Sequence, residues 1–160
     1  MIYRSTKTFT PEQGLSCVFR QWRAESHCRF LHGYAIWIKF TFEARSLDDN
    51  GWVVDFGSLK PLKEQLAATF DHKLVIAQDD PARTQFLELE SGLRYGPPKQ
   101  QQLADVVVLP QVGCEAFARH CFNLGRDHLR MSSMSDRVFV YSCEVGEHGA
   151  NSAIFTLGDA

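Results

Sequence analysis

Residues 34–43 read Tyr-Ala-Ile-Trp-Ile-Lys-Phe-Thr-Phe-Glu, an alternation of apolar and mixed positions. Strict alternation with a period of two predicts a β-strand, because successive side chains of a strand point to opposite faces. The face that we expect to be buried collects these side chains: Tyr34, Ile36, Ile38, Phe40 and Phe42. The stretch therefore predicts a long strand at the centre of a half-buried sheet.

Strand patterns also occupy both ends of the chain. Turn signals at residues 48–51 and 149–151 separate several of them, and Pro11 and Gly14 break the earliest pair. The further segments that we predict to be strands are residues 3–8, 15–20, 52–56, 137–144 and 152–157.

Two helices are expected between these strands. The first follows a candidate N-cap at Ser58 and has Pro61 in its first turn, where proline is tolerated. The second, over residues 112–129, places apolar side chains on one stripe. Between the helices, residues 86–89 and 106–109 suggest two short strands of a protruding hairpin around Gly96-Pro97-Pro98.

This order of elements predicts an α+β fold, in which an antiparallel sheet carries its helices on one face. A chain of 160 residues fits one domain, spanning residues 1–160. A short sheet cannot easily cover its own edge strands, and pairing with identical subunits would cover them. We therefore expect a homo-oligomer.

Composition excludes several classes of protein. The net charge of -2 gives no reason to expect a nucleic-acid partner, and no apolar run approaches the roughly 18 residues that cross a bilayer. The N-terminus lacks the features of a secretory signal, so we expect a cytoplasmic protein. We also expect no membrane partner and no nucleotide cofactor. Five cysteines without a CxxC pair favour reduced thiols over a disulfide framework.

The densest group of reactive residue types precedes the long strand. Cys28 lies four residues before His32, and a nearby guanidinium such as that of Arg29 or Arg23 would favour the reactive thiolate. The alternative is that Cys28 and His32 are packed core residues.

Two further positions suit acid–base or binding chemistry. Asp71 and His72 follow the first helix, and a carboxylate bonded to an imidazole fixes its tautomer and suits general acid–base catalysis. Glu144 ends a strand, where its carboxylate could accept two hydrogen bonds from a planar pterin-like or guanine-like edge. His72 could instead favour only the helix dipole, and Glu144 could be an exposed strand end.

Together these motifs resemble the 6-carboxytetrahydropterin and 6-pyruvoyltetrahydropterin synthase family. The segments that recur in the family's order are 28–33 (Cys-Arg-Phe-Leu-His-Gly), 51–56 (Gly-Trp-Val-Val-Asp-Phe), 59–60 (Leu-Lys), 70–72 (Phe-Asp-His) and 143–144 (Cys-Glu). The resemblance spans nearly the whole chain. It implies the T-fold, a four-stranded antiparallel sheet with two helices on one face, which oligomerises into a barrel as a tetramer or hexamer with active sites between subunits.

The resemblance also implies roles for individual residues. Cys28 matches the family's proton-abstracting cysteine, Asp71 and His72 match the pair that assists it, and Glu144 matches the glutamate that anchors the pterin. A lyase of this kind would act on 7,8-dihydroneopterin triphosphate or a related reduced pterin. Its product would be 6-carboxytetrahydropterin, a precursor of 7-deazaguanine nucleosides such as queuosine, or a related compound. The alternatives are a pterin- or purine-binding oligomer that has lost zinc and the family activity, and a T-fold enzyme acting on another purine-like heterocycle.

The family's catalytic zinc site is where the sequence departs from the pattern. Phe19 stands where the first of three histidine ligands belongs, and the His-Gly-His motif has become His32-Gly33-Tyr34. Either zinc is absent, or the site is rebuilt from His27, His32 and a cysteine, Cys17 or Cys28.

Four residues outside the motifs are candidates for substrate contact. Arg20 and Arg23 could hold a phosphate or developing negative charge, and Trp22 could stack on a pterin. Glu115, at the head of the second helix, lies near a segment that contacts the pterin in relatives. Each has a plainer alternative, as a surface charge, a core aromatic residue or a first-turn acid.

Overall fold

A computed structural model describes residues 1–13, 15–91 and 102–157. Its larger sheet is antiparallel, in the order β1 (Tyr3–Phe9), β4 (Trp37–Ala44), β7 (Val138–Gly146) and β8 (Ser152–Thr156). The antiparallel four-stranded sheet of the prediction is confirmed.

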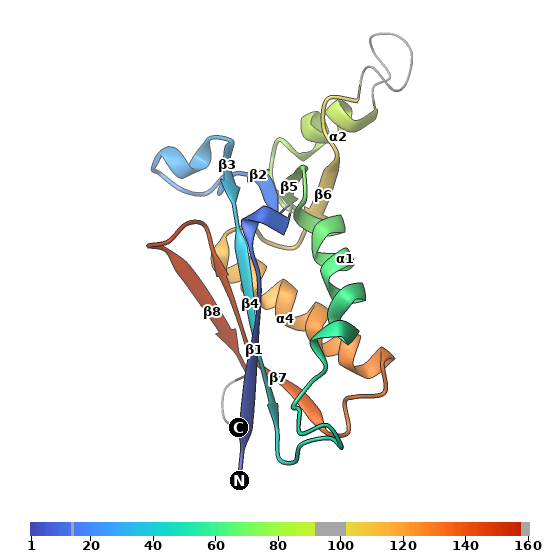
Figure 1. The fold of residues 1–160 in the computed structure, drawn as a ribbon. Coiled ribbons are helices and arrows are strands. Elements are labelled where there is room, and N and C mark those ends of the chain that lie inside the picture. Colours follow the sequence, from blue (N-terminus) through green and yellow to red (C-terminus); the bar gives the residue numbers. More distant parts are fainter. Residues whose placement is uncertain (14, 92–101, 158–160) are drawn as a thin grey trace.

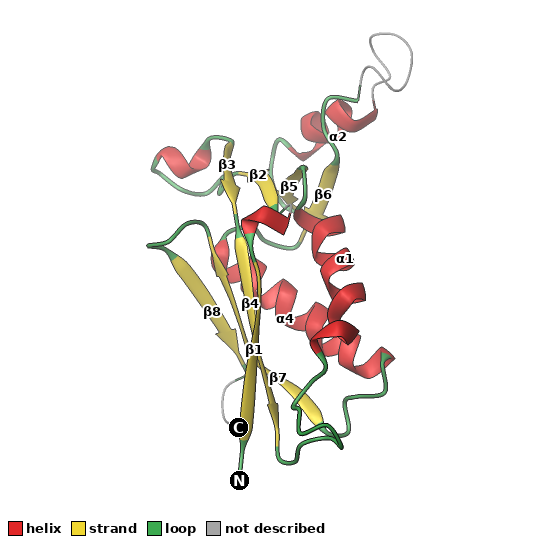
Figure 2. Ribbon diagram, in the orientation of Figure 1, coloured by secondary structure: helices red, strands yellow, loops and turns green. Residues whose placement is uncertain are grey.

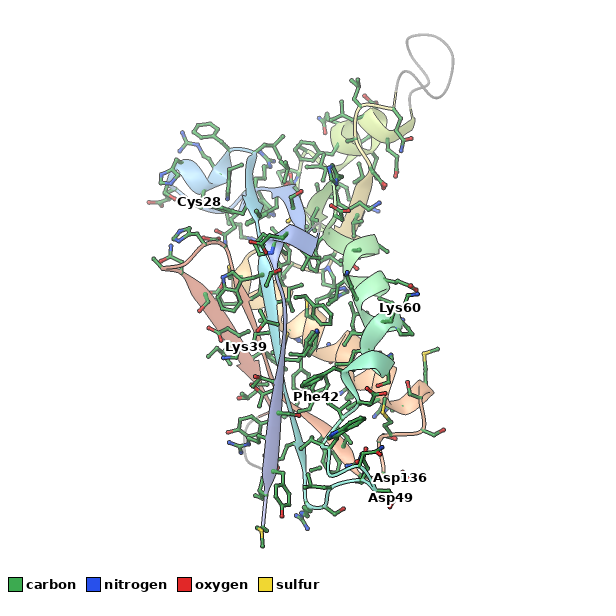
Figure 3. The ribbon with its side chains drawn as sticks, viewed as in Figure 1. Cys28, Lys39, Phe42, Asp49, Lys60 and Asp136 are labelled. Carbon is green, nitrogen blue, oxygen red and sulfur yellow. The ribbon has the colours of Figure 1, made fainter. Side chains whose placement is uncertain are left out.

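Two long helices cover one face of this sheet. Figure 1 shows α1 (Lys60–Phe70) and α4 (Cys114–Met131) on the same side of the four strands. The predicted apolar stripe of α4 is buried. In the central strand β4, every second residue is buried, and these residues form its inner face. The buried residues of these two elements include Phe117, Ala118, Cys121, Phe122, Leu129, Ile38, Phe40 and Phe42. Figure 3 shows Phe42 on the side of the helices and Lys39 on the opposite side.

The helix α4 approaches the central strand closely at Gly125. A Cβ atom at this position would lie 2.7 Å from Cε1 of Phe40 and 3.2 Å from Cγ2 of Val140. Because glycine has no Cβ atom, the helix can pack directly against the Phe40 ring of β4.

A second, smaller sheet lies at one end of the molecule (Figure 2) and was not predicted. Its order is β3 (His32–Ala35), β2 (Ser16–Phe19), β5 (Lys73–Ala77) and β6 (Val106–Leu109). The pairs β2–β5 and β5–β6 are parallel. The stretch at residues 34–43 is thus divided between the two sheets at Ile36, whose N–H donates to the carbonyl of Leu15 over 2.8 Å.

The prediction of a hairpin between the two long helices is wrong. Residues 86–89 lie in the helix α2 (Arg83–Ser91), and residues 106–109 form β6, which pairs with β5. The carboxylate of Asp80 accepts a hydrogen bond from the N–H of Ala82 over 2.8 Å and so stabilises the turn that leads into α2. The predicted loop at residues 96–98 lies outside the described residues.

Residues 52–56 do not form the predicted strand. Val53 and Val54 are both buried, so the alternation of a strand is absent. Asp55 caps the 3-10 helix η3 (Phe56–Leu59) by accepting from the N–H of Gly57 over 2.8 Å. The predicted N-cap Ser58 instead lies inside η3 and donates to the carbonyl of Asp55, and Leu59 occupies the cap of α1.

Two short 3-10 helices complete the described elements, η1 (Pro11–Gln13) and η2 (His27–Arg29). Within the described ranges, no helix is both long and apolar enough to span a bilayer.

Candidate active site

Asp71 and His72 form a hydrogen-bonded pair where α1 gives way to β5. Nδ1 of His72 lies 2.6 Å from Oδ1 of Asp71. The backbone N–H of His72 donates to the carbonyl of Ser16 over 2.8 Å, and the residue has a φ of 57°. A positive φ is uncommon for residues other than glycine, and such conformations gather at functional sites.

The geometry of this pair defines its chemistry. An ionised carboxylate only accepts hydrogen bonds, so Nδ1 of His72 carries a proton and donates to Asp71. The imidazole side chain is 85% exposed, which leaves Nε2 open to a ligand or to another chain. Asp71 thus fixes the tautomer of an accessible imidazole, as general acid–base catalysis requires.

Cys28 lies in η2, at the end of the molecule that also holds the smaller sheet (Figure 3). Oγ of Ser26 accepts from the N–H of Cys28 over 3.3 Å, and the carbonyl of Cys28 accepts from the N–H of Gln21 over 2.9 Å. The residue is half-buried. Two hydrogen bonds of its backbone therefore hold the half-buried Cys28 in place.

Tyr34 of β3 lies near Cys28 and near the turn between β7 and β8. Burial, followed by the neighbouring Glu147, Cys28 and Cys114, raises the pKa of the Tyr34 phenol. The ring of His148 in the same turn lies 6.1 Å from the Tyr34 ring. This end of the molecule thus gathers several groups that can exchange protons or hydrogen bonds.

The structure does not bring Cys28 and the Asp71–His72 pair together within one chain. Among the described residues, no hydrogen bond or ion pair joins them. His72 instead lines a cavity of about 580 Å³ between the smaller sheet and α2, whose lining does not include Cys28. Cys28 and His72 therefore do not line this cavity together.

Trp22, Arg23 and Glu115, three of the predicted substrate contacts, line one cleft of about 280 Å³. The guanidinium carbon of Arg23 lies 4.1 Å from the centre of the Trp22 ring, and Asp79 accepts hydrogen bonds from both side chains. One face of the indole is consequently covered by Arg23. The cleft has both a cation and an acid at its edge.

Arg20, the fourth predicted contact, is engaged elsewhere. Its Nε and Nη2 donate to the two carboxylate oxygens of Asp80 over 2.8 and 2.6 Å. The Asp80 side chain is fully buried, whereas that of Arg20 is 23% exposed. The hydrogen bonds from Arg20 hold the pKa of Asp80 below its usual range. This pair fixes the segment that leads to Cys28 against the turn before α2.

Glu144 lies on the face of the larger sheet that points away from the helices. Its cross-strand neighbours are Lys39 and Ile154, and Oγ of Ser152 donates to its Oε1 over 2.7 Å. The second carboxylate oxygen has no such contact within the described part of the chain. This arrangement leaves it available to a ligand.

The predicted metal ligands do not assemble into a site. His27 is exposed on η2, and Nδ1 of His32 is engaged with the carbonyl of Phe30 at 2.7 Å. Within residues 1–13, 15–91 and 102–157, no group of three His, Cys, Asp or Glu side chains is placed to hold a metal ion. The residues present therefore do not fit the zinc of the family pattern.

Sequence reasoning missed two features of this region. The first is the buried Cys114 at the start of α4, where burial and the nearby Glu147 raise the pKa of the thiol to about 12. The other feature is the pair of aspartates, Asp79 and Asp80, that fixes Arg23 and Arg20. Two adjacent acids before a proline were a visible signal, but their partners lie about 60 residues earlier in the chain.

The sequence model of the 6-pyruvoyl tetrahydropterin synthase family matches residues 8–157. The chain belongs to this family. Curated relatives are named 6-carboxy-5,6,7,8-tetrahydropterin synthase. The relative from Rickettsia bellii is 33% identical over 86 residues, which is 53% of this chain and 62% of the relative. The relative from Rickettsia typhi is 42% identical over 57 residues, or 35% of this chain and 41% of the relative. The matched part of the chain thus spans less than two thirds of either relative.

Solved structures show the same fold. An uncharacterized protein from Wolinella succinogenes superposes with a TM-score of 0.79 at 24% identity, covering 98% of both chains. A 6-pyruvoyl tetrahydropterin synthase from Plasmodium falciparum superposes with a TM-score of 0.65 at 16% identity, covering 96% of both chains. The T-fold expected from the sequence is thereby confirmed.

Proposed function

We propose that the protein is a lyase acting on the three-carbon side chain of a reduced pterin, with 7,8-dihydroneopterin triphosphate or a close relative as substrate. The observation that carries the proposal is the Asp71–His72 pair, in which a carboxylate orients an exposed imidazole on a backbone with positive φ. A protein that only binds a pterin has no need of such a pair. Membership of the 6-pyruvoyl tetrahydropterin synthase family supports a pterin as the class of substrate.

In this proposal the acid–base groups divide the work. Cys28 removes a proton from the substrate side chain as its thiolate, and His72 exchanges protons through Nε2 while Asp71 holds its tautomer. Glu144 anchors the pyrimidine edge of the pterin, whose N–H groups would donate to its carboxylate oxygens. The cleft of Trp22, Arg23 and Glu115 provides an aromatic face and polar groups for the rest of the substrate.

The proposal includes assembly into a homo-oligomer, a tetramer or a hexamer. Cys28 and His72 do not meet within one chain, so a second copy would supply one of them. The free edges of the larger sheet, β1 and β8, are the surfaces on which strand pairing between copies would occur.

Two observations favour a second candidate function, that of a pterin- or purine-binding oligomer without turnover. Two of the three family zinc positions hold Phe19 and Tyr34, and Arg20 already pairs with Asp80. A binder would keep Glu144 and the aromatic cleft and would not need Cys28.

The experiment that separates the two candidates compares binding with turnover. Wild-type protein is incubated anaerobically with 7,8-dihydroneopterin triphosphate, and products are identified by chromatography and mass spectrometry. If the protein is the lyase, a product with an altered side chain should form in wild type and in the matched control Cys121→Ala, a buried residue of α4, but not in Cys28→Ala. If wild type and Cys28→Ala bind the pterin equally well and neither forms a product, the protein is the pterin-binding oligomer instead.

A further inference from the structure

Three aromatic rings form a closed triangle on the smaller sheet. The ring centres of Phe19, His32 and Tyr34 are 4.8, 6.0 and 5.4 Å apart for the pairs 19–32, 19–34 and 32–34. They come from the paired strands β2 and β3, in which Phe19 and His32 are direct partners. Phe19 is fully buried and also packs edge-on against Phe117 of α4 at 5.1 Å.

These positions are the three to which the family pattern assigns zinc ligands. Side chains that converge from two paired strands could hold one ion if all three were imidazoles, because zinc takes three or four ligands at about 2.0–2.3 Å. Phenylalanine has no lone pair to donate, and a neutral phenol is a poor zinc ligand. Only His32 retains the chemistry of a ligand.

The sulfur atoms nearby do not repair the set. Burial raises the pKa of the Cys17 thiol to about 12, so zinc at neutral pH would have to displace a tightly held proton. Cys114 is similarly buried, and burial and the nearby Glu147 raise the pKa of its thiol to about 12. Both cysteines are therefore disfavoured as replacement ligands.

The hydroxyl of Tyr34 lies among polar groups. Tyr34 lines the cavity of about 580 Å³ that His72 also lines, and the centre of the His148 ring lies 6.1 Å from that of the Tyr34 ring. The phenol O–H is a hydrogen-bond donor, so it can donate to a ligand in this cavity. Tyr34 is half-buried, which leaves it within reach of a bound molecule.

We propose that this chain works without zinc, because the triangle of Phe19, His32 and Tyr34 fills the place of the metal, and that the Tyr34 hydroxyl donates a hydrogen bond to an oxygen of the substrate side chain. The proton stays on the phenol, and no bond to Tyr34 forms or breaks. The first part concerns metal content alone, whereas the role of Tyr34 rests on the proposed function. The two parts therefore have separate tests.

The first test measures zinc per chain. Wild type, Tyr34→His and the double variant Phe19→His/Tyr34→His are loaded with zinc sulfate, passed through gel filtration and assayed by elemental analysis. We expect less than about 0.1 zinc per chain for wild type and for the single variant, and about one for the double variant, which restores three imidazoles. Added zinc should also raise the melting temperature of the double variant alone.

Two results would overturn the first part of the proposal. About one zinc per wild-type chain, lost in His32→Ala, would overturn the metal-free assignment. A double variant that is folded by circular dichroism but retains no zinc would overturn the role of the triangle, because the three positions would then not converge as a site. Neither result depends on the substrate.

The second test uses Tyr34→Phe, which keeps the ring and removes only the hydroxyl. We expect kcat to fall about 100-fold, as for other single hydrogen-bond donors to a developing charge, while pterin binding changes less than about twofold. Turnover equal to that of wild type would show that Tyr34 only packs. Absence of turnover in wild type itself would instead count against the proposed function and leave the zinc result standing.

Discussion

The ion pair between Arg20 and Asp80 should be a main support of the segment that carries Cys28. The Asp80→Ala substitution removes the acceptor of two charge-assisted hydrogen bonds, 2.6 and 2.8 Å long, and of a third from the N–H of Ala82. Loss of one partner of a buried pair costs about 3–5 kcal/mol, because the remaining charge is left unpaired. The Arg20 side chain is 23% exposed and can regain some water, so we expect the lower end, about 3 kcal/mol.

The matched control is the neighbouring aspartate. Asp79 also pairs with an arginine, Arg23, but both side chains are largely exposed. Exposed ion pairs contribute little, so Asp79→Ala should leave the free energy of unfolding nearly unchanged. Urea denaturation at one fixed protein concentration, followed by circular dichroism, measures both variants. Equal destabilisation by the two substitutions would refute the argument that burial makes the difference.

The effect of Asp80 should also depend on pH in a defined direction. Hydrogen bonds from Arg20 lower the pKa of Asp80 in the folded chain, whereas the unfolded chain has the ordinary value of about 3.9. The stabilisation is therefore complete above the unfolded pKa and is lost as the pH falls through the folded pKa. The difference in stability between wild type and Asp80→Ala should shrink below about pH 4. A difference that stays constant into that range would contradict a charged Asp80.

Three further substitutions test the site and the core. Cys28→Ala should lower turnover of the pterin by about 100- to 10,000-fold, the usual contribution of a general base, with little change in pterin binding; unchanged product formation would exclude Cys28 as the base. His72→Gln should lower turnover at least about 10-fold while leaving the melting temperature nearly unchanged, because the side chain is 85% exposed; a large loss of stability would indicate a structural role. Gly125→Ala should destabilise the fold by about 1–2 kcal/mol in urea, because the new methyl group would lie 2.7 Å from Phe40 and its strain exceeds the gain in helix propensity; a stabilised variant would show that the ring moves aside freely.

The larger sheet and its helices could be predicted because their patterns are local. The alternation through Ile38, Phe40 and Phe42 and the stripe of α4 each mark one buried face of one element. The smaller sheet lacks such a signal. Four of the five residues of β5 are buried, and a short, continuous apolar run does not distinguish a parallel strand from a buried piece of helix.

The candidate site was also predictable only in part, where its residues are neighbours in the sequence. Asp71 and His72 are adjacent in sequence, so their pairing was open to prediction. The triangle depends on the register that places Phe19 opposite His32, and the Arg20–Asp80 pair joins residues 60 positions apart. Only the three-dimensional structure brings these residues together.

The most direct test of the central claim mixes two inactive variants. Cys28→Ala and His72→Gln are purified separately, combined under conditions that allow subunits to exchange, and incubated with 7,8-dihydroneopterin triphosphate. If Cys28 and His72 act together on the pterin from different copies, the mixture should regain part of the wild-type product, while each variant alone stays nearly inactive. A wild-type protein that binds the pterin and leaves its side chain intact would contradict the account, as would a mixture no more active than its components.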